Sequence, residues 1–361
     1  MISEATLPAL YAPWLRTVAG GDIPAEAKAT CDRCAMLASP GSDVGALYFR
    51  PETKCCTFQP GLPNFLAGRI LSESNPSMLE GRKAVEARIE RRVAIKPSQV
   101  SSGVVFGLLY RATPMAFGRA PALRCHYLSH EGECGVWKHR PGVCATWYCK
   151  HARGAIGRRF WTLADQLLRE VEQDLAFWCM AQLRVGSGEV GDLAPHPTPH
   201  VSELDGDIDW PQYRRLWESW AGREVEFYLE CARLVETLTW QQAEEKCGPR
   251  VGILAGLVRD AYIHLESSAI PERLRIKEVR LTGVERGSYK VTSYSGFDPL
   301  LMPERLSGVL RYFDGRPTEE ALHAILVEQD LHLDSSLVRR LVDFEILEAA
   351  DSGENLLPIV S

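Results

Sequence analysis

Cysteines are crowded into the first 150 of the chain's 361 residues, and over residues 93–158 they recur every few positions together with glycine, proline and histidine. Eight cysteines lie in the first 150 residues: Cys31, Cys34, Cys55, Cys56, Cys125, Cys134, Cys144 and Cys149. Because residues 93–158 are rich in turn-forming residues, they are predicted to lack long regular elements. Such a segment needs another source of order, and metal ligation supplies one because the binding energy exists only in the folded state.

The spacing of these cysteines allows several arrangements. Cys31 and Cys34 have the two-residue spacing with which a tight turn brings two thiolates to one ion, and Cys55 and Cys56 form a vicinal pair. Four thiolates from the first half and four from the second match two tetrahedral zinc sites or two iron–sulfur clusters. A disulfide framework, which needs an oxidising compartment, and a set of unrelated buried thiols are the alternatives.

Three further cysteines lie in sequence with helical periodicity: Cys179, Cys231 and Cys247. We expect these to be core or surface thiols, because free cysteine packs as a small hydrophobic residue.

One run of the sequence carries a family resemblance. Several short motifs together resemble the YkgJ family, which is described as a zinc- or iron-chelating cysteine-cluster domain. These motifs are Lys54-Cys55-Cys56, the short sequences that begin at Cys125 and Cys134, the His139–Cys144 run with its Arg-Pro pair, and Trp147-Tyr-Cys149. The resemblance covers residues 31–150 and implies that all eight cysteines bind metal. It departs from the family pattern in its first half, where twenty residues instead of two separate Cys34 from Cys55.

Basic residues accompany the second group of cysteines. Pro141 fixes its own backbone and favours an extended Arg140, which positions Cys144 relative to Cys134. Seven Lys/Arg stand against two Glu between Arg124 and Arg159, an excess that can offset thiolate charge, bind an anion or form a solvated face. Arg140, His126 and His139 are candidates to orient a ligand through a hydrogen bond.

Composition and the search for other motifs narrow the function. The net charge of -6 and the absence of a span of about 20 apolar residues argue against a nucleic-acid binder and a membrane protein. The N-terminus lacks the pattern of a secretion signal, so we expect a cytoplasmic protein. Dinucleotide, Walker, GxSxG and HExxH motifs are missing, and the sequence leaves open whether the protein is an enzyme.

The expected fold is mainly α with irregular cysteine-rich metal-binding loops and a small α+β winged-helix-like domain at the C-terminus. Helices are predicted over 8–18, 63–71, 78–92, 159–183, 210–239 and 250–268, and a loop over 184–209. We expect three domains: a cysteine-cluster domain over 1–183, a helical-bundle extension over 184–275 and a winged-helix-like module over 276–361.

The C-terminal module is predicted from two strands, VRLTG and YKVTSY, three helices over 303–313, 318–328 and 335–343, and a closing strand EILEAA. Its runs from Val309 and Leu337 are similar to the small winged-helix domains of the PqqD type, which hold peptide substrates. That resemblance implies a peptide or protein partner, which an exposed strand edge between Val279 and Thr292 could accept.

Two functions follow from these expectations. The first is a metalloprotein that holds an iron–sulfur cluster or Zn²⁺ and has a redox or group-transfer role on a peptide or protein substrate. The second is a non-enzymatic scaffold or adaptor in which zinc replaces part of a missing core.

Overall fold

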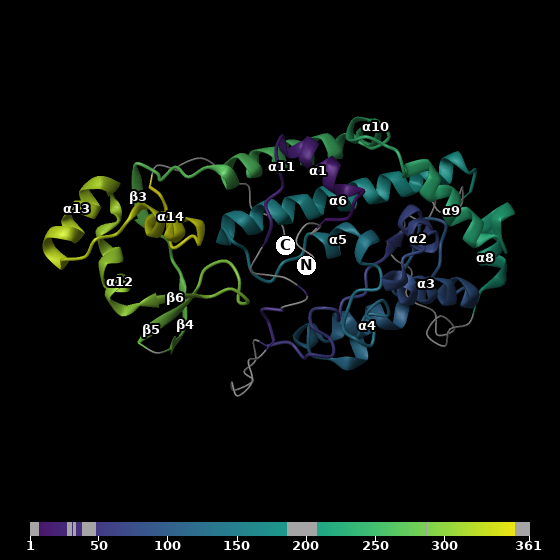
Figure 1. The fold of residues 1–361 in the computed structure, drawn as a ribbon, viewed down its shortest axis with the longest axis horizontal. Coiled ribbons are helices and arrows are strands. Elements are labelled where there is room, and N and C mark those ends of the chain that lie inside the picture. Colours follow the sequence, from purple (N-terminus) through teal and green to yellow (C-terminus); the bar gives the residue numbers. More distant parts are fainter. Residues whose placement is uncertain are drawn as a thin grey trace. The chain divides into compact units, whose positions relative to one another are not determined.

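The computed structural model describes residues 7–26, 31, 34–37, 48–185, 208–285 and 287–350 of the chain (Figure 1). About 53% of it is helical and the strands form small antiparallel sheets, which confirms a mainly α fold with a small α+β part. The chain forms two compact units. The first comprises Met1–Ala25, Thr30–Trp147 and Trp161–Asp260, and the second Glu26–Ala29, Tyr148–Phe160 and Ala261–Ser361. The division into three domains stays a prediction.

Helices build most of the first unit, and two of the long ones, α6 and α11, continue into the second. Their bounds are α1 Tyr11–Ala19, α2 Asn64–Leu71, α3 Leu79–Arg91, α4 Val104–Ala112, α5 Gly142–Ala145, α6 Gly154–Gln182, α8 Trp210–Trp217, α9 Glu224–Val235, α10 Trp240–Glu244 and α11 Pro249–Glu266. Phe160, Leu167 and Leu175 are fully buried along α6, as the helical spacing of its apolar residues predicts. In the described ranges, no helix is both long and apolar enough to cross a bilayer.

The structure differs from the predicted arrangement of helices in two places. The helix predicted over 210–239 is interrupted, because Gly222 has a left-handed backbone (φ 88°) and its N–H donates to Glu224 Oε1 at 2.7 Å. Tyr213 Oη donates to the same oxygen at 2.5 Å, so the break between α8 and α9 is held from both sides. In addition, α4 forms within the segment that was predicted to lack long regular elements.

One glycine allows two helices of the first unit to approach closely. A Cβ on Gly68 of α2 would lie 1.8 Å from the backbone carbonyl oxygen of Tyr228 in α9. Only a residue without a side chain fits there. The close approach of the α2 and α9 backbones therefore requires glycine at position 68.

The second unit contains two three-stranded antiparallel sheets, with strand orders β7-β3-β8 and β4-β5-β6. The strands are β3 Arg273–Ile276, β4 Arg280–Glu285, β5 Ser288–Thr292, β6 Leu300–Pro303, β7 Asp314–Pro317 and β8 Leu347–Ala349, and the helices are α12 Glu304–Val309, α13 Thr318–Gln329 and α14 Ser335–Asp343. The predicted strands and the three predicted helices are thus confirmed, and β3, β6 and β7 are additional. Leu274, Phe313, Ile325, Leu341 and Ile346 form the centre of its core.

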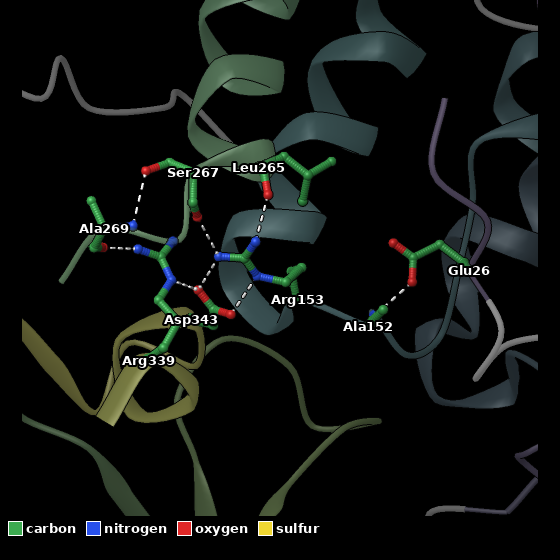
Figure 2. Close-up of polar contacts among 8 residues, drawn as sticks. All are labelled: Glu26, Ala152, Arg153, Leu265, Ser267, Ala269, Arg339 and Asp343. Carbon is green, nitrogen blue, oxygen red and sulfur yellow. Dashed lines mark hydrogen bonds and ion pairs between the residues drawn. The ribbon is translucent and has the colours of Figure 1, made fainter. Parts of the chain in front are cut away.

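A buried carboxylate, Asp343 at the end of α14, joins segments within the second unit (Figure 2). Arg153 donates to both of its oxygens and also to the carbonyls of Leu265 and Ser267, at the end of α11. Arg339 donates to Asp343 Oδ1 at 2.9 Å and to the carbonyl of Ala269. Guanidinium groups therefore satisfy carbonyls that the end of α11 leaves without helical partners.

Candidate functional site

The cysteines predicted to bind metal lie in turns and short helices, and all eleven cysteines of the chain are free thiols. Seven of the eight candidates belong to the first unit, namely Cys31, Cys34, Cys55, Cys56, Cys125, Cys134 and Cys144, whereas Cys149 is buried in the second. Cys179 and Cys231 are fully buried, as a core role predicts, and Cys247 is half-buried.

Backbone hydrogen bonds bring two cysteine segments together. The N–H of Cys125 donates to the carbonyl of Cys56 at 2.8 Å, although the two residues lie far apart in sequence. Leu128 and Cys134 form an isolated antiparallel bridge, which folds the segment between Cys125 and Cys134 back on itself. The vicinal pair and this hairpin-like loop are therefore neighbours.

Lys54 connects a third segment to these two. Its Nζ donates to the carbonyl of Cys31 at 3.0 Å and to the carbonyl of Gly132 at 2.9 Å. The backbone of Lys54 is in the left-handed region (φ 48°), so the turn before Cys55 and Cys56 is tight. One ammonium group thus joins the loops that carry Cys31, the vicinal pair and Cys134.

Arg140 holds the segment between Cys134 and Cys144. Its backbone is extended (φ -66°, ψ 142°), which confirms the conformation predicted from Pro141. The buried guanidinium lies 3.6 Å from the centre of the Trp137 ring and donates to the carbonyls of Trp137 at 2.6 Å and Cys144 at 3.3 Å. A side chain predicted to orient ligands therefore fixes the backbone beside one of them.

The thiols are close enough to affect one another's protonation. A hydrogen bond to Cys56, together with burial, raises the pKa of Cys55, whereas the same hydrogen bond lowers the pKa of Cys56, with help from Lys54 and Arg124. Burial raises the pKa of Cys125 and of Cys134 to about 12, and charge on Cys56 adds to both shifts. Compared with Cys55, Cys125 and Cys134, whose pKa values are raised, Cys56 therefore ionises more readily.

Burial and the charge of neighbouring thiols also raise the pKa values of Cys144 and Cys31. Burial, and then charge on Cys134, raises the pKa of Cys144. Burial, and then charge on Cys56, raises the pKa of Cys31. Loops from four parts of the sequence therefore place their thiols within electrostatic reach of one another.

The thiols lie near one another but do not form a metal-binding arrangement among the described residues. Within the described part of the chain, no three His, Cys, Asp or Glu side chains are arranged to hold a metal ion. The donor chemistry suits a soft ion such as zinc or the iron of an iron–sulfur cluster. The thiols of the described residues would have to draw closer to surround such an ion.

The two histidines predicted to orient ligands have other surroundings. His139 forms a hydrogen bond of 3.1 Å with Glu73 Oε2, and burial lowers its pKa. His126 is exposed, and partial desolvation followed by the charges of Arg88 and Arg91 lowers its pKa. Their proposed roles beside a metal stay predictions.

Sequence reasoning missed two contacts that position the loops. A Cβ on Gly81 of α3 would lie 1.9 Å from the carbonyl oxygen of Gly135, so α3 approaches the loop after Cys134 closely. Glu172 accepts hydrogen bonds from Tyr11 and from the N–H of Gly142, two residues before Cys144. The only signal for Glu172 is its place on the apolar stripe of α6, four residues after Leu168.

The strand edge predicted to accept a partner is present in the second unit. β4 pairs with β5 alone and forms one edge of its sheet. Leu281 and Val284 on this strand are 60% and 71% exposed, so the edge strand presents apolar side chains to solvent.

In comparisons with known proteins, no family model, no curated protein sequence and no solved structure matched this chain.

Proposed function

We propose that this protein binds a thiophilic metal centre, Zn²⁺ or an iron–sulfur cluster, through the cysteine loops of its first unit. The observation that carries this proposal is the convergence of the loops: Cys125 N–H bonds to the Cys56 carbonyl, and Lys54 bridges the carbonyls of Cys31 and Gly132. The ligands we propose in this unit are Cys31, Cys34, Cys55, Cys56, Cys125, Cys134 and Cys144. A ligand role for Cys149, which belongs to the second unit, stays a prediction.

The charges around the loops support this assignment. Four thiolates around a dication carry a net charge of about -2, which buried surroundings would disfavour without compensation. Lys54, Arg124 and Arg140 each lower the pKa of at least one of the thiols, so they favour the thiolate form that a metal requires. A bound metal would supply a soft Lewis-acidic or redox-active centre, and these cations would balance its ligands.

Anaerobic purification with metal and acid-labile sulfide analysis tests the proposal. We expect stoichiometric zinc, or iron and sulfide with visible absorption. Cys56→Ser should remove most of the bound metal, because Cys56 has the lowered thiol pKa at the centre of the set. Cys247→Ser, outside the loops and half-buried, is the matched control and should retain it. A wild-type chain that takes up less than one metal ion, even after reconstitution with zinc or with iron and sulfide, would contradict the proposal.

A second candidate is a purely structural zinc site in a scaffold or adaptor. Lys54 and Arg140 donate hydrogen bonds to backbone carbonyls of the loops. These contacts favour a structural zinc site, because they restrain the loops and leave little freedom for ligand exchange. Colourless protein that contains zinc and no sulfide, and whose melting temperature falls sharply with a chelator, would identify this role. Electron transfer into the centre, or iron with sulfide, would identify the redox or group-transfer alternative.

A peptide or protein partner at the C-terminal unit is also part of the proposal. The free edge of β4 supports it, because an extended segment could add to that strand through main-chain hydrogen bonds. Val284→Lys should then abolish partner capture without changing metal content, because a lysine on an exposed edge opposes strand addition.

A further inference from the structure

A pocket of about 550 Å³ opens on the second unit, between β6, α12, the segment around Leu333 and α14. Ten of its fourteen lining residues are leucine, proline or phenylalanine. Its size lies in the range of about 300–1,000 Å³ that small-molecule sites occupy. A space of this size with apolar walls is suited to an apolar molecule.

Apart from Asp298, the buried wall of the pocket is apolar, and two arginines line its mouth. Leu306, Leu341 and Phe344 are buried and form its inner wall, whereas Arg305 and Arg340 are exposed and line its opening. A ligand that matches both parts needs an apolar chain and an anionic end.

The two arginines at the mouth are not neutralised within the described residues. Arg305 donates to the backbone carbonyls of Gln329 and Asp330, which are neutral acceptors. Arg340 lies 5.7 Å from the centre of the Phe344 ring, and the neighbouring carboxylate of Asp343 is already bound by Arg153 and Arg339. Both guanidinium groups therefore keep charge that an anion at the mouth can meet.

The polar group inside the pocket fixes the direction of the ligand. Asp298 is buried and accepts hydrogen bonds from Tyr294 Oη and from the N–H of His151. Its negative charge opposes a second anion at depth, so the anionic end of a ligand belongs at the mouth with the arginines. We propose that this pocket binds an apolar monocarboxylate, with its hydrocarbon chain inside and its carboxylate between Arg305 and Arg340.

Isothermal titration of the full-length chain with decanoate, below its micelle concentration, tests this site. We expect saturable binding of one decanoate per chain, and much weaker binding of decyltrimethylammonium, which has the same chain length and the opposite charge. Arg340→Gln should weaken decanoate binding about tenfold, because one charge-assisted contact is lost. Arg311→Gln is the matched control, since Arg311 lies against Tyr312 outside the pocket lining.

A second variant keeps the test independent of folding. Leu301 lines the pocket and is 50% exposed, so Leu301→Asp should leave the fold intact. Far-UV circular dichroism would verify this. The new carboxylate places a negative charge beside the ligand. We expect at least about a tenfold loss of decanoate affinity from it. Absence of saturable binding to the wild type, equal binding of the cationic amphiphile, or no effect of Arg340→Gln and Leu301→Asp would each overturn the proposal. Because metal content is measured separately, this result is independent of the cysteine loops.

Discussion

The hydroxyl of Tyr11 in α1 donates a hydrogen bond of 2.5 Å to Oε1 of Glu172 in α6, and both side chains are buried. The N–H of Gly142 donates to the same oxygen at 2.6 Å. A single buried carboxyl group therefore anchors the N-terminal helix and the Arg140–Cys144 loop to the longest helix of the chain.

This carboxyl group makes stability depend on pH. Burial raises the pKa of Glu172 from 4.5 to about 7, so the folded protein holds this proton to a higher pH than the unfolded chain does. Its contribution to stability is complete below about pH 4.5 and is lost as the pH rises through about 7. The loss amounts to about 3 kcal/mol, because one pKa unit corresponds to about 1.4 kcal/mol.

Glu172→Gln should remove this dependence. Glutamine keeps the accepting oxygen and has no charge, so the variant should match the wild type at pH 5 and exceed its free energy of unfolding at pH 8 by up to about 3 kcal/mol. Urea denaturation at both pH values measures the difference, with Glu170→Gln on the same helix as the control. Parallel pH profiles for wild type and Glu172→Gln would contradict this explanation.

Lys54→Met should destabilise the cysteine loops. The variant keeps an unbranched side chain one atom shorter and loses the ammonium group that bridges the carbonyls of Cys31 and Gly132. We expect a loss of about 1.5–3 kcal/mol in the free energy of unfolding, the range for hydrogen bonds to a charged group. Lys83→Met, at an exposed position on α3, should change stability little. Equal stability of the two variants would show that the bridge is not formed in solution.

Gly68→Ala should disrupt the packing of α2 on α9. The new Cβ would lie 1.8 Å from the Tyr228 carbonyl oxygen, so the helices must move apart, at a cost of about 3 kcal/mol or more. Gly256→Ala is the opposite control: it lies within α11 with open space around it, and alanine should stabilise the helix by up to about 1 kcal/mol. Thermal unfolding of the two variants should show shifts of opposite sign.

Asp343→Ala should destabilise the second unit. It leaves the guanidinium groups of Arg153 and Arg339 without their shared carboxylate, and removing one partner of a buried ion pair costs about 3–5 kcal/mol. Asp314→Ala removes an exposed carboxylate that pairs with Arg316, and its unfolding midpoint should not change measurably. Similar midpoints for Asp343→Ala and the wild type would mean that the cluster in Figure 2 contributes nothing to stability.

Features with a local cause could be predicted from the order of the residues alone. The apolar spacing along 159–183 gave α6 because a helix repeats every 3.6 residues. The Arg140-Pro141 pair determined an extended Arg140, since the proline ring restricts the residue before it. The alternation on both sides of Gly287 determined the hairpin of β4 and β5.

Contacts between residues far apart in the chain became visible only once the chain was folded. Nothing in the residues around Lys54 indicates that its ammonium group reaches Cys31 and Gly132, and nothing near Gly68 indicates that Tyr228 lies against it. The break before α9 likewise depends on Glu224 accepting hydrogen bonds from both Gly222 and Tyr213. Local patterns follow from the geometry of one segment, whereas these contacts depend on how separate segments pack, which no single stretch of sequence contains.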